Sequence, residues 1–405
     1  MFLRAAWVLP IDQPPIRDGW VEIVAGQIRS VGPTVPHVRT ADVVELPAHL
    51  LLPGLVNAHT HLDLAGVTTP CSAHQGFVPW LDTVVAYRRA ASTADLQHGL
   101  RRAVRELLAG GVTCVGDYIG DARWFSLLAT TPFKGTAWLE VIGCTPERIT
   151  EHRQAMNAAL QRCAAFSAQW PHGFTPHAPY SVHRDALHAL LAKRASSVPL
   201  AIHCAESPEE WEFFTTASGP LWTRMTQLGW RGTPDAHSPL HYLDSVGPLP
   251  PRTCLIHGNY LHADDIALLQ QRRCTVIHCP PSHAHFGFRC FPLEALMAAN
   301  IPIALGTDSH ASASTIGMLA ALRQVQQTYP ALATAQLVRM ATRGGAEALG
   351  LEKRCGSLSP GMAADLAAVR LLDPTADPYQ NVLLNDTADR VWIDGEEQHA
   401  ASDTP

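Results

Sequence analysis

The sequence has few charged residues for its length and no cluster of basic ones. Only 16% of its 405 residues are Asp, Glu, Lys or Arg, the formal net charge is −6, and 47% of the residues are hydrophobic. Because binding to a nucleic-acid backbone requires clustered Lys and Arg, no nucleic-acid partner is expected. The hydrophobic content is enough for one large buried core and excludes a disordered or fibrous chain.

Signals for export or membrane insertion are also missing. The first residues, MFLRAAWVLPIDQPP, have too short an apolar run before Pro10 and Pro14 for a signal peptide, and no apolar stretch is long enough to span a membrane. The ten cysteines are scattered singly without a CxxC pair, which excludes a zinc ribbon and is typical of free thiols in a reducing compartment. We therefore expect a cytoplasmic protein without membrane contact.

No GxGxxG or GxxxxGK[ST] motif follows an early strand, so a doubly wound nucleotide-binding sheet is not favoured. Helical segments near residues 95–109, 121–129, 150–165 and 333–349 instead alternate with eight short apolar runs. These runs are LLLPGLVNAH, VTCVGD, GTAWLEVIG, GFTPHA, VPLAIHC, TCLIHG, CTVIHC and IPIALGTD. This alternation predicts an α/β fold, a (β/α)8 barrel over residues 51–355, with β-rich segments at 1–50 and 356–405.

Histidine is abundant, with 21 residues, and polar side chains end most of the predicted strands. They are His59, His61, His177, His203, Glu206, His257, His278 and Asp308. The carboxyl ends of barrel strands converge on one rim, and three imidazoles with one carboxylate suit Zn²⁺ or Fe²⁺ with an open position for water. Any one of these histidines alone is more often a hydrogen-bonded rim residue. Their conjunction, as HTH, HCAE, IHG and GTD on different strands, indicates a metal site.

The segments PGLVNAHTHLD, TPHAPYS, HCAES, HGNYL and GTDS resemble the amidohydrolase superfamily, in its branch of single-metal deaminases and chlorohydrolases. The similarity spans nearly the whole chain. GSLSPGMAADLAAV is similar to the closing strand of that family, which implies a small β-sandwich formed by residues 1–50 and 356–405. A homodimer is compatible with the resemblance.

The resemblance implies a set of site residues that hold one divalent metal ion, Zn²⁺ or Fe²⁺, and use it. The implied ligands are His59, His61, His203 and Asp308, with Glu206 as proton shuttle and His257 in support. The fourth strand ends in TPHAPY without Lys or an acidic residue, which favours one metal over two. His177 is thereby left to contact the substrate or to pack against the rim.

These residues would support hydrolytic removal of an amino group. The metal lowers the pKa of its water, Asp308 accepts the water proton, and His257 stabilises the attacking oxygen. Glu206 donates a proton to the ring nitrogen next to the attacked carbon. The alternative for Glu206 is a helix N-terminal charge in ESPEEW.

The segment IHCPPSHAHFG departs from the HNPxSN and HCPSSN forms and resembles the HCPxSHxxFG form of aminodeoxyfutalosine deaminases, which act in menaquinone biosynthesis. That resemblance implies conversion of the 6-amino group of an adenine nucleoside, extended by an aryl carboxylate, into a 6-oxo group. The alternatives are deamination of S-adenosylhomocysteine, methylthioadenosine or a guanine derivative, triazine dechlorination, and an inactive scaffold. Because every expected ligand is present, the scaffold is the least favoured.

Several residues are candidates for binding such a small-molecule substrate. Candidates for contacts with the base or ribose are His177, Ser282, His283 and Glu140. Candidates for packing against the aryl ring are Phe77, Trp80, Trp211 and Phe214. The carboxylate would pair with Arg88, Arg89 or Arg289. Each has an ordinary alternative, because aromatic and Arg side chains usually pack a helix or lie on a solvated face.

Overall fold

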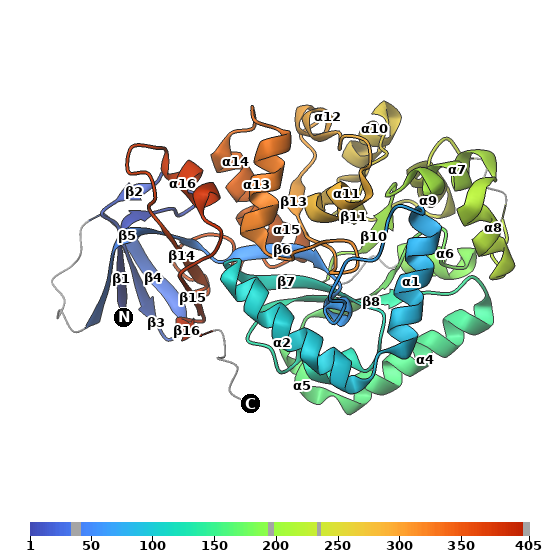
Figure 1. Cartoon of the computed structure of the whole chain (residues 1–405), viewed down its shortest axis with the longest axis horizontal. Helices are drawn as coiled ribbons and strands as arrows, with labels where there is room; N and C mark the ends of the chain where they lie inside the picture. The colour runs from blue at the N-terminus through green and yellow to red at the C-terminus, as the bar shows by residue number, and fades with distance from the viewer. Residues whose placement is uncertain (34–41, 193–197, 233–235, 400–405) are drawn as a thin grey trace.

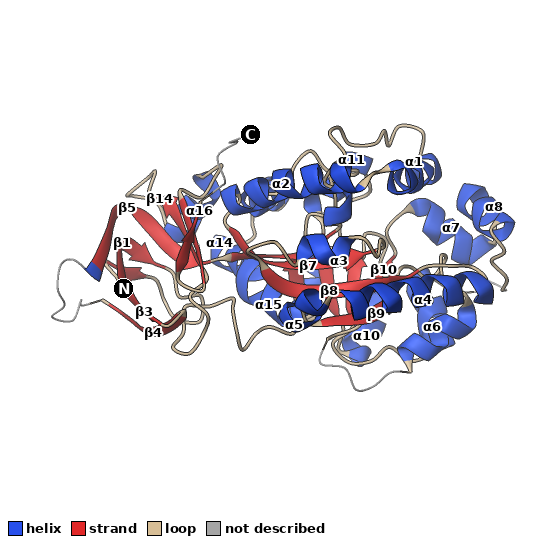
Figure 2. Ribbon diagram, turned by 90° about the horizontal axis from the view of Figure 1, so that it is seen from below, coloured by secondary structure: helices blue, strands red, loops and turns tan. Residues whose placement is uncertain are grey.

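The structure is a computed structural model that describes residues 1–33, 42–192, 198–232 and 236–399. It has two parts, a sheet made from both ends of the chain and a barrel of parallel strands between them (Figure 1). Helices cover the strands of the barrel on its outer side (Figure 2). Among the described helices, none combines the length and the apolar character needed to cross a membrane.

The predicted (β/α)8 barrel is confirmed. Its strands are β6 (Leu55–Thr60), β7 (Val112–Ile119), β8 (Lys134–Val141), β9 (His172–Pro176), β10 (Ala201–Cys204), β11 (Cys254–His257), β12 (Thr275–His278) and β13 (Ile303–Leu305). They pair in parallel as two groups of four, β6 to β9 and β10 to β13. Backbone hydrogen bonds join the groups at both seams, from the His203 amide to the His177 carbonyl and from the Asp308 amide to the His59 carbonyl, each 3.0 Å long. The barrel is therefore closed at the end that carries the histidines.

The helices follow the strands much as predicted. They are α1 (Phe77–Ala90), α2 (Thr93–Ala109), α3 (Trp124–Leu128), α4 (Pro146–Arg162), α5 (Ala164–Gln169), α6 (Arg184–Leu191), α7 (Pro208–Thr216), α8 (Gly219–Gln227), α9 (Pro239–Val246), α10 (Ala263–Arg272), α11 (Pro280–Phe286), α12 (Leu293–Ala298), α13 (Met318–Thr328), α14 (Thr334–Arg339), α15 (Gly345–Leu349) and α16 (Pro378–Leu384). The helix predicted near 333–349 is interrupted by a π-helical turn, Met340–Gly344, between α14 and α15. A short 3₁₀ turn, Leu62–Leu64, follows β6.

Several helices begin with the same local signal, a hydroxyl or carboxylate side chain followed by proline. Thr145 caps α4, Ser207 caps α7 and Ser238 caps α9, and each accepts a hydrogen bond from a backbone amide of the first turn. Proline at the next position has a backbone angle suited to the helix and no amide hydrogen to satisfy. These starts fix where the loops after the strands end, and therefore the shape of the rim.

The two ends of the chain form one sheet of eight strands. They are β1 (Phe2–Val8), β2 (Ile16–Arg17), β3 (Trp20–Val24), β4 (Gln27–Gly32), β5 (Val43–Pro53), β14 (Leu366–Arg370), β15 (Arg390–Ile393) and β16 (Glu396–Gln398). The hydrogen-bonded order is β16-β15-β14-β5-β1-β3-β4, and β2 pairs with β1. The two terminal segments, which were predicted to form a β-sandwich, are thus joined in one hydrogen-bonded sheet through the pairing of β5 with β14. The sheet packs around its own apolar core, which includes Leu3, Val21, Leu366 and Trp392.

The first predicted strand, LLLPGLVNAH, is divided between the two parts of the molecule. Residues up to Pro53 belong to β5 of the terminal sheet, and residues from Leu55 belong to β6 of the barrel. Gly54 lies at the crossing, where a Cβ atom would meet the Thr113 hydroxyl at 2.1 Å. Only glycine fits so close to β7, and the chain can therefore pass directly from one sheet to the other.

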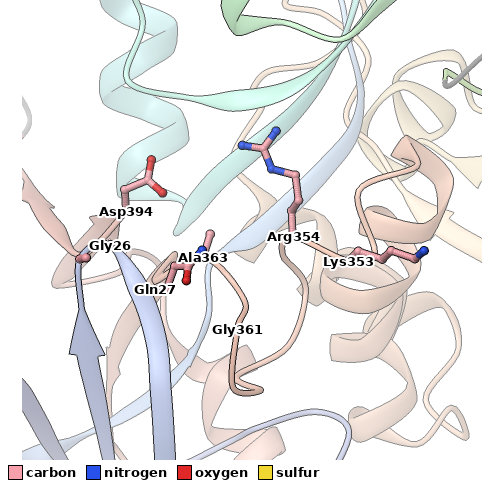
Figure 3. Close-up of a pocket in the computed structure, with 8 residues that line it drawn as sticks. Gly26, Gln27, Lys353, Arg354, Gly361, Ala363 and Asp394 are labelled. Atoms are coloured by element: carbon pink, nitrogen blue, oxygen red, sulfur yellow. The ribbon is translucent and has the colours of Figure 1, made fainter.

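The junction between the two parts contains a small cavity of about 320 Å³. Figure 3 shows Gly26 and Asp394 on the side of the terminal sheet and Lys353 and Arg354 on the side of the barrel. Nearby, Lys134 at the start of β8 pairs with Asp365 at 2.8 Å and also with Asp394. None of the predicted site residues lines this cavity, and the ion pairs indicate that it is a structural joint.

Candidate active site

Four predicted site residues come together at the carboxyl ends of barrel strands. They are His59 in β6, His61 directly after β6, His203 in β10 and Asp308 after β13. All four are buried, and the centroids of the three imidazole rings lie 4.9 to 5.3 Å apart. One ligand atom from each of His59, His61 and Asp308 falls within 4.8 Å of the other two. The strand ends have therefore gathered side chains that are almost 250 positions apart in sequence.

The hydrogen bonds of two histidines show which of their nitrogens are free to bind a metal. The Nδ1 atom of His61 lies 3.0 Å from the Tyr118 carbonyl oxygen, and the Nδ1 atom of His203 lies 2.8 Å from the His177 carbonyl oxygen. A carbonyl oxygen can only accept, so these contacts place the hydrogen on each Nδ1 and leave a lone pair on each Nε2. The Arg88 guanidinium also approaches Nδ1 of His61, but at 3.3 Å it is the longer of the two contacts at that atom. The two Nε2 atoms face one another at 3.2 Å.

Two lone pairs at that distance repel each other unless a cation lies between them. Protonation does not supply that cation, because burial lowers the pKa of both His61 and His203 well below the usual value. His59 adds to the argument, since both of its ring nitrogens are buried without a hydrogen-bond partner among the described residues. This donor set fits a divalent metal ion such as Zn²⁺ or Fe²⁺.

The two carboxylate oxygens of Asp308 have different surroundings: one accepts hydrogen bonds from hydroxyl groups, and the other faces the imidazoles. Its Oδ2 atom accepts hydrogen bonds from the hydroxyls of Ser282 at 2.9 Å and Ser312 at 2.6 Å. Its Oδ1 atom lies 3.6 Å from Nε2 of His59 and 3.8 Å from Nε2 of His61. Burial acts to raise the pKa of Asp308, but the His59 contact and the surrounding rings outweigh it and lower the pKa. The group is therefore ionised, with one oxygen directed at the imidazoles.

Three residues at this rim have backbone angles that L-amino acids seldom adopt. The φ angles of Ala205, His257 and Asp308 are 55°, 71° and 65°. Each lies just after the end of a strand or at it, where the chain must turn sharply away from the barrel. Such left-handed conformations cost energy and are retained where they hold functional side chains in place.

Glu206 and His257 lie next to the proposed metal ligands and face each other. The Oε1 atom of Glu206 is 3.5 Å from the Nε2 atom of His257, and both residues are buried. Burial, and then the neighbouring charge of Asp308, raises the pKa of Glu206 well above its usual value. Burial lowers the pKa of His257 to about 3. These shifts favour the protonated form of the Glu206 carboxyl group and the neutral form of the His257 imidazole.

Glu206 is itself held by contacts from helix α7 and from the loop after strand β11. The buried carboxylate of Glu210 accepts the backbone amide hydrogen of Glu206 at 2.7 Å, and the Asn259 side chain donates to the Glu206 carbonyl at 3.0 Å. Burial raises the pKa of Glu210 to about 8. These contacts fix the backbone of Glu206 on the turn after β10.

A second group of buried charges lies behind the histidines. Glu140 at the end of β8 is 3.8 Å from His203 and 3.9 Å from His61, and burial raises its pKa to about 8. Neither of its oxygens has a hydrogen-bond partner among the described residues. Arg88 on α1 lies 3.7 Å from Glu140 and pairs with the buried carboxylate of Asp63 at 2.9 Å. Arg88 is therefore already neutralised from within the protein.

A cavity of about 480 Å³ opens from this site toward solvent. Its inner end is lined by polar groups: His61, His177, His203, Glu206, His257 and Asp308. Its walls are mostly apolar, and Phe77, Trp80, Val84 and Tyr180 contribute to them. The Trp80 indole is fixed by a 2.9 Å hydrogen bond to the Ala311 carbonyl. The shape suits an organic molecule whose reacting end is polar and whose body is apolar.

His177 lies at the inner end of the cavity, with its Nδ1 atom 2.7 Å from the hydroxyl of Ser181. Burial lowers the pKa of His177 to about 3, so the ring is neutral. Its Nε2 atom is 4.0 Å from Glu140, outside hydrogen-bond distance. His177 therefore has the position expected of a substrate contact.

Other predicted substrate residues do not line the cavity. Ser282 is occupied by Asp308, Trp211 packs at a tilt against His262, and Phe214 stacks on Tyr242. His278, which was predicted only as a polar residue at a strand end, stacks on Phe291. His283 contacts the Asn259 side chain at 2.9 Å, while Arg289 stacks over Tyr260 and donates to backbone carbonyls. Glu140 lies behind the histidines. For these residues, the packing alternative describes what the structure shows.

Some residues that contact the site were not predicted from the sequence. Ser312 supports Asp308 from four positions further along, and Asp63 neutralises Arg88 from two positions after His61. Their closeness to predicted ligands in sequence is the signal that could have identified them. Arg148 and Arg224, which line the outer part of the cavity, lie on helices α4 and α8 and have no such signal.

Comparison with known proteins gives consistent results. The sequence model described as Amidohydrolase family matches residues 50–397. The chain is 35% identical over 318 residues to an aminodeoxyfutalosine deaminase of Deinococcus radiodurans, covering 74% of this chain and 73% of that protein.

Two solved structures share the fold over nearly the whole chain. A Helicobacter pylori aminofutalosine deaminase in complex with methylthio-coformycin superposes with a TM-score of 0.82 at 19% identity, covering 98% of this chain and all of that chain (100%). An adenosine deaminase from Xanthomonas campestris with bound zinc superposes with a TM-score of 0.77 at 24% identity, and the match covers 98% of this chain and 92% of that chain.

Proposed function

This chain belongs to the amidohydrolase family, and from that premise we propose that it is a metal-dependent deaminase of an adenine nucleoside, with aminodeoxyfutalosine as its substrate. The reaction replaces the 6-amino group of the base by a 6-oxo group in menaquinone biosynthesis. The observation that carries the proposal is the pair of imidazole lone pairs facing each other at 3.2 Å, beside an ionised Asp308 and a protonated Glu206.

One divalent ion, Zn²⁺ or Fe²⁺, would be held by His59, His61, His203 and Asp308. When bound, such an ion acts as a Lewis acid and makes hydroxide available from water at neutral pH. Zinc is bound in the Xanthomonas campestris structure of the same fold.

The protein's own residues then supply the proton transfers. Attack on the carbon that carries the amino group places negative charge on the adjacent ring nitrogen. Glu206, which holds a proton because its pKa is raised, donates from its carboxyl group to that nitrogen. His257, neutral and 3.5 Å from Glu206, is placed to hydrogen-bond the oxygen that adds to the ring. Glu206, now a carboxylate, can then take the proton of the added hydroxyl and pass it to the amino group, which leaves as ammonia as the carbon–oxygen double bond forms.

Three features support an extended nucleoside as the substrate. The cavity reaches beyond the histidines into an apolar section formed by α1 and neighbouring elements, which suits an aryl group. The Deinococcus radiodurans relative, at 35% identity, is an aminodeoxyfutalosine deaminase. The segment IHCPPSHAHFG resembles the form found in such enzymes.

The test is a substrate panel with zinc-loaded enzyme. Aminodeoxyfutalosine, methylthioadenosine, S-adenosylhomocysteine, a guanine derivative and a chlorotriazine are compared by the ultraviolet change from adenine to hypoxanthine and by release of ammonia or chloride. We expect the highest kcat/KM for aminodeoxyfutalosine. Faster turnover of methylthioadenosine or S-adenosylhomocysteine would assign the enzyme to another substrate, and no ammonia from any of them would contradict deamination altogether.

A further inference from the structure

The outer end of the active-site cavity is charged, unlike its apolar middle. The charged lining residues there are Asp82, Arg89, Arg148, Glu151 and Arg224. They come from α1, α4 and α8, which lie on the side of the barrel away from the terminal sheet (Figure 1). None of the proposed metal ligands is among these charged residues.

Most of these charges are already paired within the protein. Arg224 makes two hydrogen bonds to the Asp82 carboxylate, at 2.9 and 2.8 Å. Arg148 lies 3.7 Å from Glu151 on the same helix. His152, which also lines the cavity, is neutral because burial lowers its pKa. Asp82 and Glu151, the two acidic residues at this end, are therefore each paired with an arginine.

Arg89 is the exception. Among the residues that the structure describes, its guanidinium group has no ion pair and no hydrogen bond, although the side chain borders the cavity. Its neighbour Arg88 differs, since Arg88 is bound to Asp63 and lies beside Glu140. The cavity wall thus has one cation more than the protein itself neutralises.

Helix α1 presents one row of side chains to the cavity, and Arg89 belongs to that row. Phe77, Leu81 and Val85 line the cavity at successive turns of the helix, and Arg89 comes one turn later at the same spacing. A ligand lying along α1 would have its apolar part against these side chains. Its far end would then meet the guanidinium group, which can bind a carboxylate through two parallel hydrogen bonds.

We propose that Arg89 forms an anion subsite at the outer end of the cavity, which binds a carboxylate at the far end of an extended nucleoside. The inference rests on the proposed function and narrows it, because it selects adenosines with an anionic substituent on the sugar over neutral ones. Of the three arginines predicted to bind the carboxylate, Arg89 is the one with both a free guanidinium group among the described residues and a place in the cavity wall. Arg88 is neutralised by Asp63, and Arg289 lies outside the cavity, stacked over Tyr260.

The experiment compares Arg89→Met and Arg89→Lys with wild type on two substrates that differ in charge at the far end. These are aminodeoxyfutalosine and methylthioadenosine, assayed with the zinc-loaded enzyme. We expect Arg89→Met to raise KM for the carboxylate substrate about tenfold to a hundredfold, as for loss of a charge-assisted hydrogen bond, and to leave methylthioadenosine within about twofold. Arg89→Lys should recover part of the loss. Added salt should raise KM for the carboxylate substrate in wild type and not in Arg89→Met.

Arg101→Met is the matched control. Arg101 is an exposed arginine of α2 that does not line the cavity, and its replacement should change neither KM. Melting temperatures of all variants report on folding. A loss shared equally by both substrates, or no loss with either, would overturn the anion subsite.

A binding measurement separates this inference from the proposed function. The 6-oxo product carries the same carboxylate, so its affinity and that of its methyl ester can be measured by calorimetry without turnover. If wild type deaminates neither substrate, the proposed function fails, whereas tighter binding of the acid than of the ester, lost in Arg89→Met, would still support the subsite. Equal affinities for acid and ester in wild type would overturn it.

Discussion

The inner and outer ends of one cavity are built in different ways. At the inner end, the side chains extend from barrel strands, are buried, and are held by specific contacts such as those of Asp308 with Ser282 and Ser312. At the outer end, they extend from helices and are largely exposed: Arg148 and Glu151 have 77% and 68% of their side-chain surface in contact with solvent. The buried side chains that we propose for the chemistry therefore come mainly from the barrel strands, whereas the exposed charges that we propose for substrate selection come from helices outside the barrel.

The largest effect should come from Glu206→Gln at the inner end. Glutamine fills the same space but cannot donate the proton, so kcat should fall by about 10² to 10⁴ while one equivalent of metal is retained. Turnover by stopped-flow absorbance and metal content by emission spectrometry check both parts. The matched change at the outer end, Glu151→Gln, should alter kcat by less than about twofold. Equal losses in the two variants would remove the distinction between the ends.

A pH-dependent effect on stability should distinguish buried from exposed carboxylates. In the folded protein the pKa of Glu210 is raised from about 4.5 to about 8, so between these values the folded state holds a proton that the unfolded state has lost. The contribution of Glu210 to the free energy of unfolding of the wild type is therefore lost as the pH rises from about 4.5 to about 8. Glu210→Gln does not titrate, and its free energy of unfolding relative to wild type should rise over this range by at most about 4 to 5 kcal/mol.

Urea unfolding of both proteins at pH 5 and pH 8.5 measures that difference. Glu151→Gln serves as the exposed control and should give the same difference from wild type at both pH values. A constant difference for Glu210→Gln as well would mean that Glu210 is not held in a buried, protonated state.

A smaller effect is expected from Ser312→Ala, which removes one of two hydrogen bonds to the Asp308 carboxylate. Loss of such a supporting contact weakens metal binding about tenfold to a hundredfold. Competition with a chelator gives the zinc affinity. Ser126→Ala, an exposed serine on α3, should leave the affinity unchanged. Unaltered zinc binding in Ser312→Ala would show that Asp308 needs no such support.

The inner end was far easier to predict from the sequence than the outer end. The strands of a parallel barrel read as short apolar runs, and the residue after each run must lie at the rim, so His59, His203 and Asp308 could be assigned to one place. The family resemblance supplied their roles. The position of Gly54, where one predicted strand divides between two sheets, depends on the tight contact with Thr113, which no local pattern reveals.

Side chains on helices and loops were harder to assign, because their direction depends on how each helix packs. Ser282 follows a strand end, yet it turns toward Asp308 rather than into the cavity. Arg289 is directed at backbone carbonyls and stacks over Tyr260. Conversely, Arg224 lines the cavity from α8, more than a dozen residues beyond the end of β10. Such placements follow from tertiary packing and cannot be read from residue order.

The account depends most on a single cation between the imidazoles and Asp308. The direct measurement is anomalous diffraction at the zinc absorption edge from crystals of the zinc-loaded protein. We predict one strong peak, about 2.0 to 2.2 Å from Nε2 of His61, Nε2 of His203, a nitrogen of His59 and Oδ1 of Asp308. No peak at this position, or a peak bound instead by Glu140 and the outer carboxylates, would contradict the account.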